Sequence, residues 1–180
     1  MKAFLIIILI PIIACSTNEQ TNPDNQDFHI HADFKVYLNG IPYNFSKEKY
    51  MSEEDESIHL HDMDGDIIHM HKEGTTLEEF FSSLGMQFTK DCFVLDNKTK
   101  YCNSKKNTLK MYVNGKKNTQ FQNYVFNDLD RILISYGNET NLTNQMDSVT
   151  DKACIQSGSC PERGTASEES CASGTDVCAI

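Results

Sequence analysis

The chain of 180 residues is long enough for one hydrophobic core and hardly for two. Its net charge of −10, from 26 acidic and 16 basic residues without a conspicuous basic cluster, argues against a nucleic-acid partner, because neutralising phosphates needs a basic face. Nine glycines, four prolines and the lack of sustained heptads exclude collagen and coiled coil. Two counts remain informative: seven cysteines, and six histidines that all lie between residues 29 and 71.

The N-terminus predicts export. Residues 3–14 are apolar apart from Pro11, a run too short for a membrane span, which needs about 20 residues, but suited to a secretory signal. The run ends Ile12-Ile13-Ala14-Cys15, which resembles the lipobox of bacterial-type lipoproteins, where the cysteine becomes the lipid-bearing first residue. We expect a signal peptide over residues 1–14 and a lipid anchor with a polar tether over residues 15–26; an ordinary cleaved signal is the alternative. The protein would then be a membrane-anchored lipoprotein of the cell envelope, outside the cytoplasm.

The remaining cysteines predict disulfides, because an exported chain with an even number of cysteines meets oxidising conditions. Cys92 and Cys102 bracket a polar segment between two short apolar runs, so we expect a bridge across that hairpin. The other four lie in the last 27 residues and allow three pairings that the sequence does not separate: Cys154, Cys160, Cys171 and Cys178.

Two hairpins are expected in the first half of the mature chain. Residues 28–38 alternate apolar and polar side chains, the pattern of a half-buried strand. Asn39-Gly40 then forms a two-residue turn into residues 41–45. A second hairpin joins residues 58–62 to residues 67–71 around Asp64-Gly65.

A short helix and further strands follow. Thr76 and Glu79 have capping-box spacing ahead of an apolar stripe that Gly85 ends. A strand is expected over residues 108–113, followed by a turn at Asn114-Gly115, and another strand over residues 131–136; the apolar pattern stops after Asn138. This order predicts an α+β domain over residues 27–138, with a small mixed or antiparallel sheet packed on one short helix in a β-grasp-like arrangement. Residues 139–180 are expected to form a Cys-rich polar tail, an appendage constrained by disulfides.

All six histidines belong to His-x-His pairs. On a strand, residues i and i+2 project from one face about 6.5–7 Å apart, so two imidazoles can bind one metal ion without backbone movement. A single pair is a weak signal, but three pairs within 43 residues predict a metal site. The predicted ligands are His29, His31, His59, His61, His69 and His71.

The register of the second hairpin decides whether its histidines meet. A strict two-residue turn at Asp64-Gly65 would place its two His-x-His pairs on opposite faces. A three-residue loop over residues 63–65, with Gly65 in the left-handed conformation, would place His59 opposite His69 and gather the apolar side chains on the other face. Because register follows the burial of one apolar face, we favour the three-residue loop. All six histidines converge if the strand over residues 28–38 lies next to this hairpin with its histidines on the same face.

Neutral imidazoles suit zinc, copper and nickel, and we expect Zn²⁺ or Cu⁺/Cu²⁺. A thioether on the histidine face would favour copper. Carboxylates nearby could act as ligands or accept a hydrogen bond from an imidazole. The residues expected to supply these groups around the ligands are Asp33, Asp62, Met63 and Asp66.

Five motifs of the chain are distinctive: His29-Ile-His-Ala-Asp-Phe-Lys-Val-Tyr-Leu-Asn-Gly40, His59-Leu-His-Asp, Gly65-Asp-Ile-Ile-His69, Thr76-Leu-Glu-Glu-Phe-Phe and Cys154-Ile-Gln-Ser-Gly-Ser-Cys-Pro-Glu-Arg-Gly164. Together they resemble a family of exported small domains from archaeal and bacterial genomes that has no established function. The last motif is similar to an archaeal subgroup of that family. The resemblance implies that the histidine region is a signature of the family, and it implies no activity.

The sequence therefore predicts a lipid-anchored, extracytoplasmic metal-binding domain whose partners are a metal ion and the membrane, and whose protein partner is unknown. A metalloenzyme with Glu73 or Asp62 as its base is one alternative, although no hydrolase motif is present. A pH-responsive surface and a structural surface module without metal are others. Thiol–disulfide exchange is disfavoured because the chain has no Cys-x-x-Cys.

Overall fold

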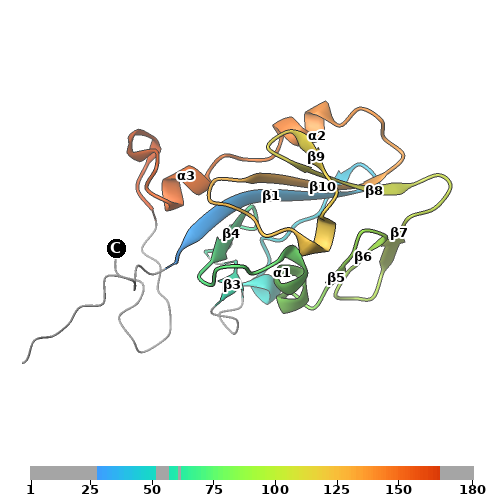
Figure 1. The fold of residues 1–180 in the computed structure, drawn as a ribbon, viewed down its shortest axis with the longest axis horizontal. Coiled ribbons are helices and arrows are strands. Elements are labelled where there is room, and N and C mark those ends of the chain that lie inside the picture. The colour runs from blue at the N-terminus through green and yellow to red at the C-terminus, as the bar shows by residue number, and fades with distance from the viewer. Residues whose placement is uncertain (1–27, 52–56, 61, 167–180) are drawn as a thin grey trace, which may run out of the picture.

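The computed structural model describes residues 28–51, 57–60 and 62–166 (Figure 1). The predicted signal peptide, Cys15, the tether, His61, Cys171 and Cys178 lie outside the described residues. The strands are β1 (Ile30–Leu38), β2 (Ile41–Pro42), β3 (Ile58–His59), β4 (Ile67–Met70), β5 (Gln87–Phe88), β6 (Cys92–Val94), β7 (Lys100–Cys102), β8 (Thr108–Val113), β9 (Lys116–Asn118) and β10 (Arg131–Gly137). The α-helices are α1 (Leu77–Ser83), α2 (Thr143–Asp147) and α3 (Ala153–Gln156), and 3-10 turns cover Glu48–Tyr50, Phe121–Asn123 and Pro161–Arg163.

The main sheet has the strand order β3-β4-β1-β10-β8-β9, with β2 also paired to β1. The central strands β1 and β10 are parallel, and the other pairs of this sheet are antiparallel. A parallel central pair, flanking antiparallel hairpins and a helix across one face form the β-grasp arrangement that the element order predicted. The α+β class is confirmed.

Two predicted turns have the required geometry. Asn39 and Gly40 have φ angles of 54° and 77°, and Asn114 and Gly115 have 51° and 75°. Positive φ at both central residues is the type I′ turn, whose twist matches that of the flanking strands.

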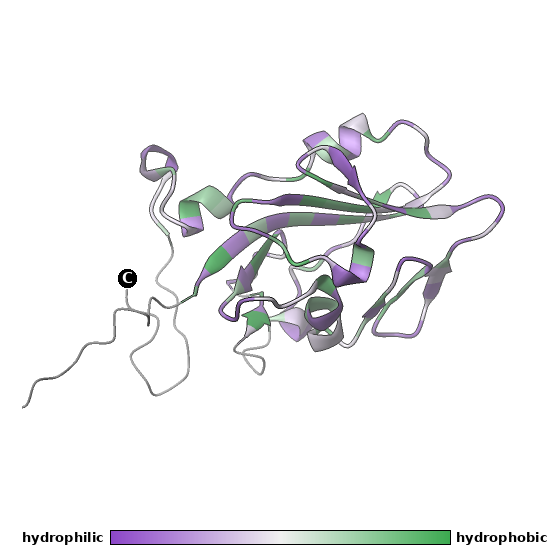
Figure 2. Cartoon of the chain, viewed as in Figure 1, coloured by the Kyte–Doolittle hydropathy of each residue, from purple (hydrophilic) through white to green (hydrophobic). Residues whose placement is uncertain are grey.

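Helix α1 closes the main core. Thr76 accepts a hydrogen bond from the Glu79 N–H, and the Glu79 carboxylate accepts one from the Thr76 N–H at 2.7 Å, so the capping box is present. Phe80 and Phe81 are fully buried and pack in the core that also contains the inward face of β1. Figure 2 shows apolar and polar residues alternating along the central strands, which is why one face of the sheet is available to α1.

A second, three-stranded sheet follows in the order β5-β6-β7. Cys92 and Cys102 occupy directly paired positions on β6 and β7 and form the predicted disulfide. The second disulfide joins Cys154 to Cys160 and selects one of the pairings that the sequence left open.

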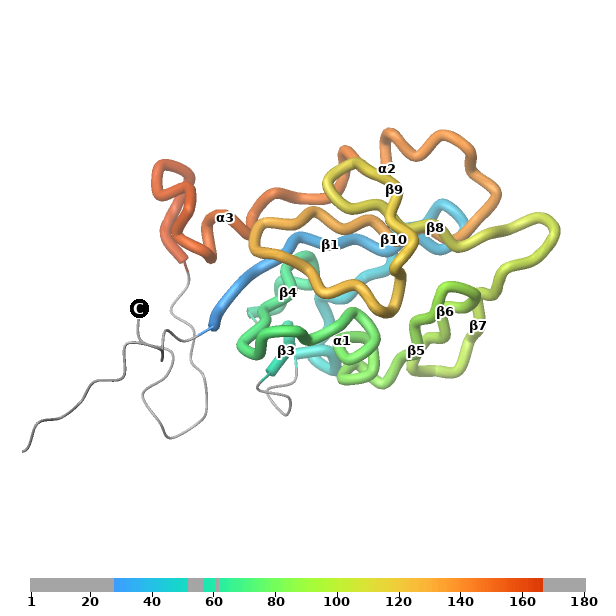
Figure 3. Tube along the Cα trace, viewed as in Figure 1, coloured from blue at the N-terminus to red at the C-terminus, as the bar shows by residue number. Residues whose placement is uncertain are grey.

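The C-terminal segment, residues 139–166, packs on the face of the main sheet opposite α1 (Figures 1 and 3). It adds two short helices to the single helix that we expected. Leu142 and Val149 pack against Leu133 of β10, and α3 contacts β1. The segment therefore covers part of the sheet, and β1 is buried on both faces around His31 and Asp33.

Candidate metal centre

Three adjacent strands bring the histidines together. Strand β4 lies between β1 and β3, with His69 paired to His31 on one side and to His59 on the other. These pairs have the register that the burial argument favoured. Since cross-strand partners on one face have neighbouring side chains, the three imidazoles form a row across the sheet.

The loop that produces this register differs from the predicted one. Asp62 and Met63 adopt the left-handed conformation, with φ angles of 55° and 57°, whereas Gly65 does not. Gly65 is needed for a different reason: a Cβ there would lie 2.3 Å from the Ser46 nitrogen and 2.4 Å from the Phe45 carbonyl carbon. Gly65 is therefore needed because its backbone lies close to the backbone of Phe45 and Ser46, and not because of a left-handed conformation.

Five histidines line one face of β1, β4 and their neighbours; we call His29, His31, His59, His69 and His71 the histidine strip. Ring centroids are 4.4 Å apart for His29 and His31, 4.2 Å for His29 and His71, 4.6 Å for His31 and His69, and 5.1 Å for His59 and His71. Possible ligand atoms of His29, His31 and His69 all lie within 4.8 Å of one another. This trio could hold a metal ion.

The strip is largely enclosed. His31 and His69 are 1 % and 2 % exposed, and His59 is also buried. Solvated polar residues usually occupy the outer face of such a sheet, so burial of several imidazoles there is unusual. The C-terminal segment covers its β1 side, through α3 beside the start of β1 (Figure 3).

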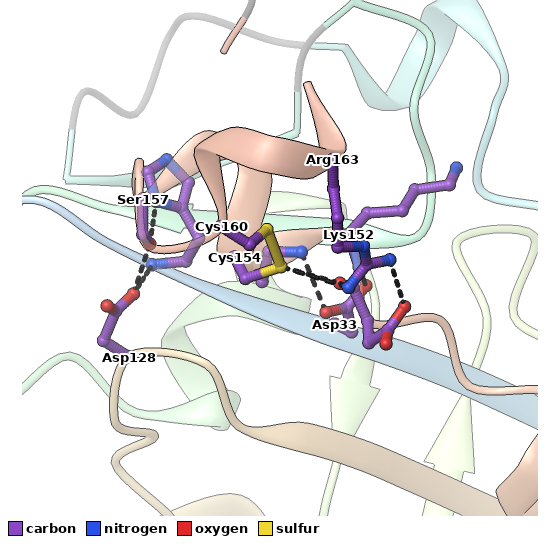
Figure 4. The surroundings of a disulfide bond; sticks show 10 residues. Asp33, Asp128, Lys152, Cys154, Ser157, Cys160 and Arg163 are labelled. Carbon is purple, nitrogen blue, oxygen red and sulfur yellow. Dashed lines mark hydrogen bonds and ion pairs between the residues drawn. A yellow bond between two sulfur atoms is a disulfide. The ribbon is translucent and has the colours of Figure 1, made fainter. Parts of the chain in front are cut away.

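A hydrogen-bonded chain orients His31. The Ser157 hydroxyl donates to Asp128 Oδ1 at 2.6 Å, and His31 Nδ1 lies 2.8 Å from the Ser157 Oγ (Figure 4). A serine has one hydroxyl proton, which the carboxylate takes, so His31 Nδ1 must be the donor to Ser157. In the neutral imidazole, Nε2 then carries the lone pair that can coordinate a metal.

Neither Ser157 nor Asp128 was predicted as part of the site. Ser157 is 126 residues from His31 in sequence, and Asp128 precedes β10 in what the pattern shows only as a connection. Ser157 lies in the loop that the Cys154–Cys160 disulfide closes. In Figure 4 the disulfide lies between the contacts of Ser157 with Asp128 and the contacts around Asp33. The contact between Ser157 and His31 follows from the packing of the C-terminal segment on the sheet, which no local sequence pattern indicates.

Asp33 and Met63, two of the predicted supporting residues, have surroundings other than those expected. The Asp33 carboxylate, 1 % exposed, accepts hydrogen bonds from the Thr150 hydroxyl and from the Lys152 and Ala153 N–H groups, both at 2.9 Å. It therefore fixes the start of α3. Met63 is 52 % exposed in the loop that also contains Asp62, so the structure brings no thioether from Met63 into the enclosed strip.

Ion pairs surround the same end of the sheet. Lys152 Nζ lies 3.0 Å from an Asp64 oxygen, and Lys35 Nζ lies 3.4 Å from an Asp66 oxygen. Burial lowers the pKa of Lys152, but the hydrogen bond to Asp64 and the charges of nearby aspartates outweigh it, so that the pKa is raised overall. Lys152 thus remains a cation that ties α3 to the loop before β4.

Comparisons with models of known families, with curated proteins and with solved structures each found no match. Among the described helices, none is both long and apolar enough to cross a membrane. The case for a function therefore depends on the residues of the site.

Proposed function

We propose that this protein is an extracytoplasmic, lipid-anchored metal-binding domain that holds a zinc or copper ion through His29, His31 and His69. The observation that carries the proposal is the convergence of these three imidazoles within 4.8 Å on a buried face. Such a cluster of imidazoles suits a metal ion, since neutral imidazole is a preferred ligand of both zinc and copper.

The geometry is close to that of a three-histidine site. Tetrahedral zinc with Zn–N bonds of about 2.0–2.1 Å needs ligand nitrogens about 3.3 Å apart. The trio is looser than this, and rotation of the His29 and His69 imidazoles about their side-chain torsions would bring their nitrogens closer to His31. His31 has its orientation set by Ser157 and Asp128, as expected of a ligand with a supporting partner.

The proposed location outside the cytoplasm is supported by two independent features. The sequence Ile12-Ile13-Ala14-Cys15 resembles a lipobox, and the described residues contain two disulfides. Disulfides persist mainly in oxidising compartments. The resemblance to exported small domains agrees with this location and remains a prediction.

Calorimetric titration of the purified full-length chain in detergent, with a competing chelator, tests the proposal. We expect Zn²⁺ or Cu²⁺ to bind with one ion per chain, and His69→Ala to weaken binding at least about hundredfold because one of three ligands is lost. His59→Ala is the matched control, since His59 is buried on the same strip but lies outside the trio. It should change the affinity only a few-fold.

Equal affinities of the wild type and His69→Ala would refute the trio as the site, provided that both chains have the same far-UV circular dichroism. Absence of binding by the wild type would refute the function itself. Metal analysis of the protein isolated from its native envelope then decides between zinc and copper.

A further inference from the structure

Half of the basic residues lie in one segment. Residues 90–117 contain eight lysines and two aspartates, a net charge of +6 in a chain whose total is −10. No basic cluster was apparent in the sequence because these lysines occur singly or in pairs over 28 residues. The fold gathers several of them around one cavity.

This cavity has a volume of about 710 Å³, within the usual range of small-molecule sites. Its lysines come from four places: the turn before β6, the connection between β7 and β8, β8 itself and β9. They are Lys90, Lys106, Lys110 and Lys117, and Asp91 and Glu139 also line the cavity. The lining therefore has a net charge of +2 in a strongly acidic protein, which favours an anionic ligand.

The β8–β9 hairpin places part of this lining on one face. Tyr112 pairs with Lys117, and residues two apart on a strand share a face, so Lys110, Tyr112 and Lys117 project to the same side. Leu109 and Met111 project to the opposite side, into the main core. The basic face of the hairpin is thus the one that α1 does not cover.

Lys110 is the most constrained of the four lysines. Its Nζ donates to the Gly137 carbonyl at 2.8 Å and to the Thr108 carbonyl at 3.3 Å, which uses two of its three N–H donors. Burial lowers its pKa, and the carboxylate of Glu139 opposes this effect. The side chain is held in place before any ligand arrives, which reduces the entropy lost on binding.

We propose that this cavity binds a small phosphorylated molecule. Lysine is a common phosphate ligand that acts as a point charge, and four lysines line the cavity. Thr108, Thr119 and Asn103 add neutral polar groups, and Tyr112 and Phe121 add aromatic surface for the uncharged part of the ligand.

The cavity is remote from the histidine strip. Strand β10 lies between β1 and β8, and its residue Ser135 pairs with Lys110 on one side and Tyr37 on the other. Tyr37 is six residues along β1 from His31, which corresponds to about 20 Å. The two sites lie at opposite ends of the sheet, so this proposal stands independently of the metal site.

Titration of the full-length chain with inorganic pyrophosphate at low salt tests the proposal. The triple variant K90Q/K106Q/K117Q removes three lysines of the cavity, and K98Q/K100Q/K116Q removes the same charge from the same segment outside its lining. In water, each ammonium–phosphate contact at about 4 Å raises the affinity roughly fivefold. The first variant loses three such contacts and should therefore bind pyrophosphate about hundredfold more weakly. The second should remain within about threefold of the wild type, and both should bind metal like the wild type.

Equal losses in the two variants would overturn the proposal, because general charge and not the cavity would then bind the anion. The same conclusion would follow if pyrophosphate did not bind at millimolar concentration, or if citrate bound as tightly as pyrophosphate. Binding of heparin but not of pyrophosphate would instead indicate a polyanion surface and would also overturn it.

Discussion

Replacement of Ser157 by alanine tests the architecture of the proposed metal site more directly than removal of a ligand does. The change removes the acceptor 2.8 Å from His31 Nδ1 and the donor 2.6 Å from Asp128, and it leaves all three proposed ligands in place. His31 is almost fully buried, so solvent cannot readily replace the lost partner. Loss of a residue that orients a metal-bound histidine typically weakens affinity 10–100-fold, or about 1.4–2.8 kcal/mol. We expect Ser157→Ala to fall in this range.

The assay is competitive titration of zinc, and separately of copper, against a chelator at pH 7.5. Ser159→Ala is the matched control, since Ser159 is an exposed serine within the same disulfide-closed loop. It should bind within about twofold of the wild type. Ser157→Thr keeps a hydroxyl at the same position and should recover most of the affinity.

Thermal unfolding without metal separates a local effect on His31 from loss of the fold. If Ser157→Ala melts like Ser159→Ala yet binds metal as tightly as the wild type, then Ser157 does not position His31 and the reasoning is refuted. Equal losses in Ser157→Ala and Ser159→Ala would attribute the effect to the loop as a whole, which also contradicts the proposed role of the hydroxyl.

Three further predictions concern stability. Gly65→Ala should lower the unfolding free energy by about 3 kcal/mol, measured by urea denaturation, because its Cβ would lie 2.3 Å from a backbone nitrogen. Removing the disulfide in C92A/C102A should cost about 3 kcal/mol by the same measurement, since the bridge closes a loop with a sequence separation of 10. The pKa of Asp96 is held below its usual value chiefly by the hydrogen bond from Lys49. Its contribution to stability is therefore present above about pH 4 and is lost as the pH falls further, so Asp96→Asn should flatten the acid limb of a pH–stability curve.

The sequence was sufficient where a local pattern determined the structure. Alternation along residues 28–38, the two Asn-Gly turns and the Thr76–Glu79 capping box all describe interactions between close neighbours. The His59–His69 register was also predictable, because only that register buries one apolar face. The loop that achieves it was not, since the space around Gly65 depends on a chain segment about 20 residues earlier.

The cover over the histidine strip could not be predicted for a related reason. Residues 139–166 are mostly polar, and they attach through a few apolar contacts, such as Leu142 and Val149, and through hydrogen bonds to Asp33. Such contacts produce no periodic pattern of apolar residues in the sequence. The polar face of β1 was therefore expected to face solvent, whereas Asp33 and His31 are each 1 % exposed.

The net charge of −10 conceals an uneven distribution of charge along the chain. Residues 90–117 carry +6, so the rest of the chain carries −16. At the histidine end, Asp64, Asp66 and Asp128 lie close to the strip or its supporting contacts, and Lys35 and Lys152 offset only part of their charge. The proposed metal site and the proposed anion cavity thus each lie beside described side chains whose charge favours the ligand, a relation that the overall charge alone does not reveal.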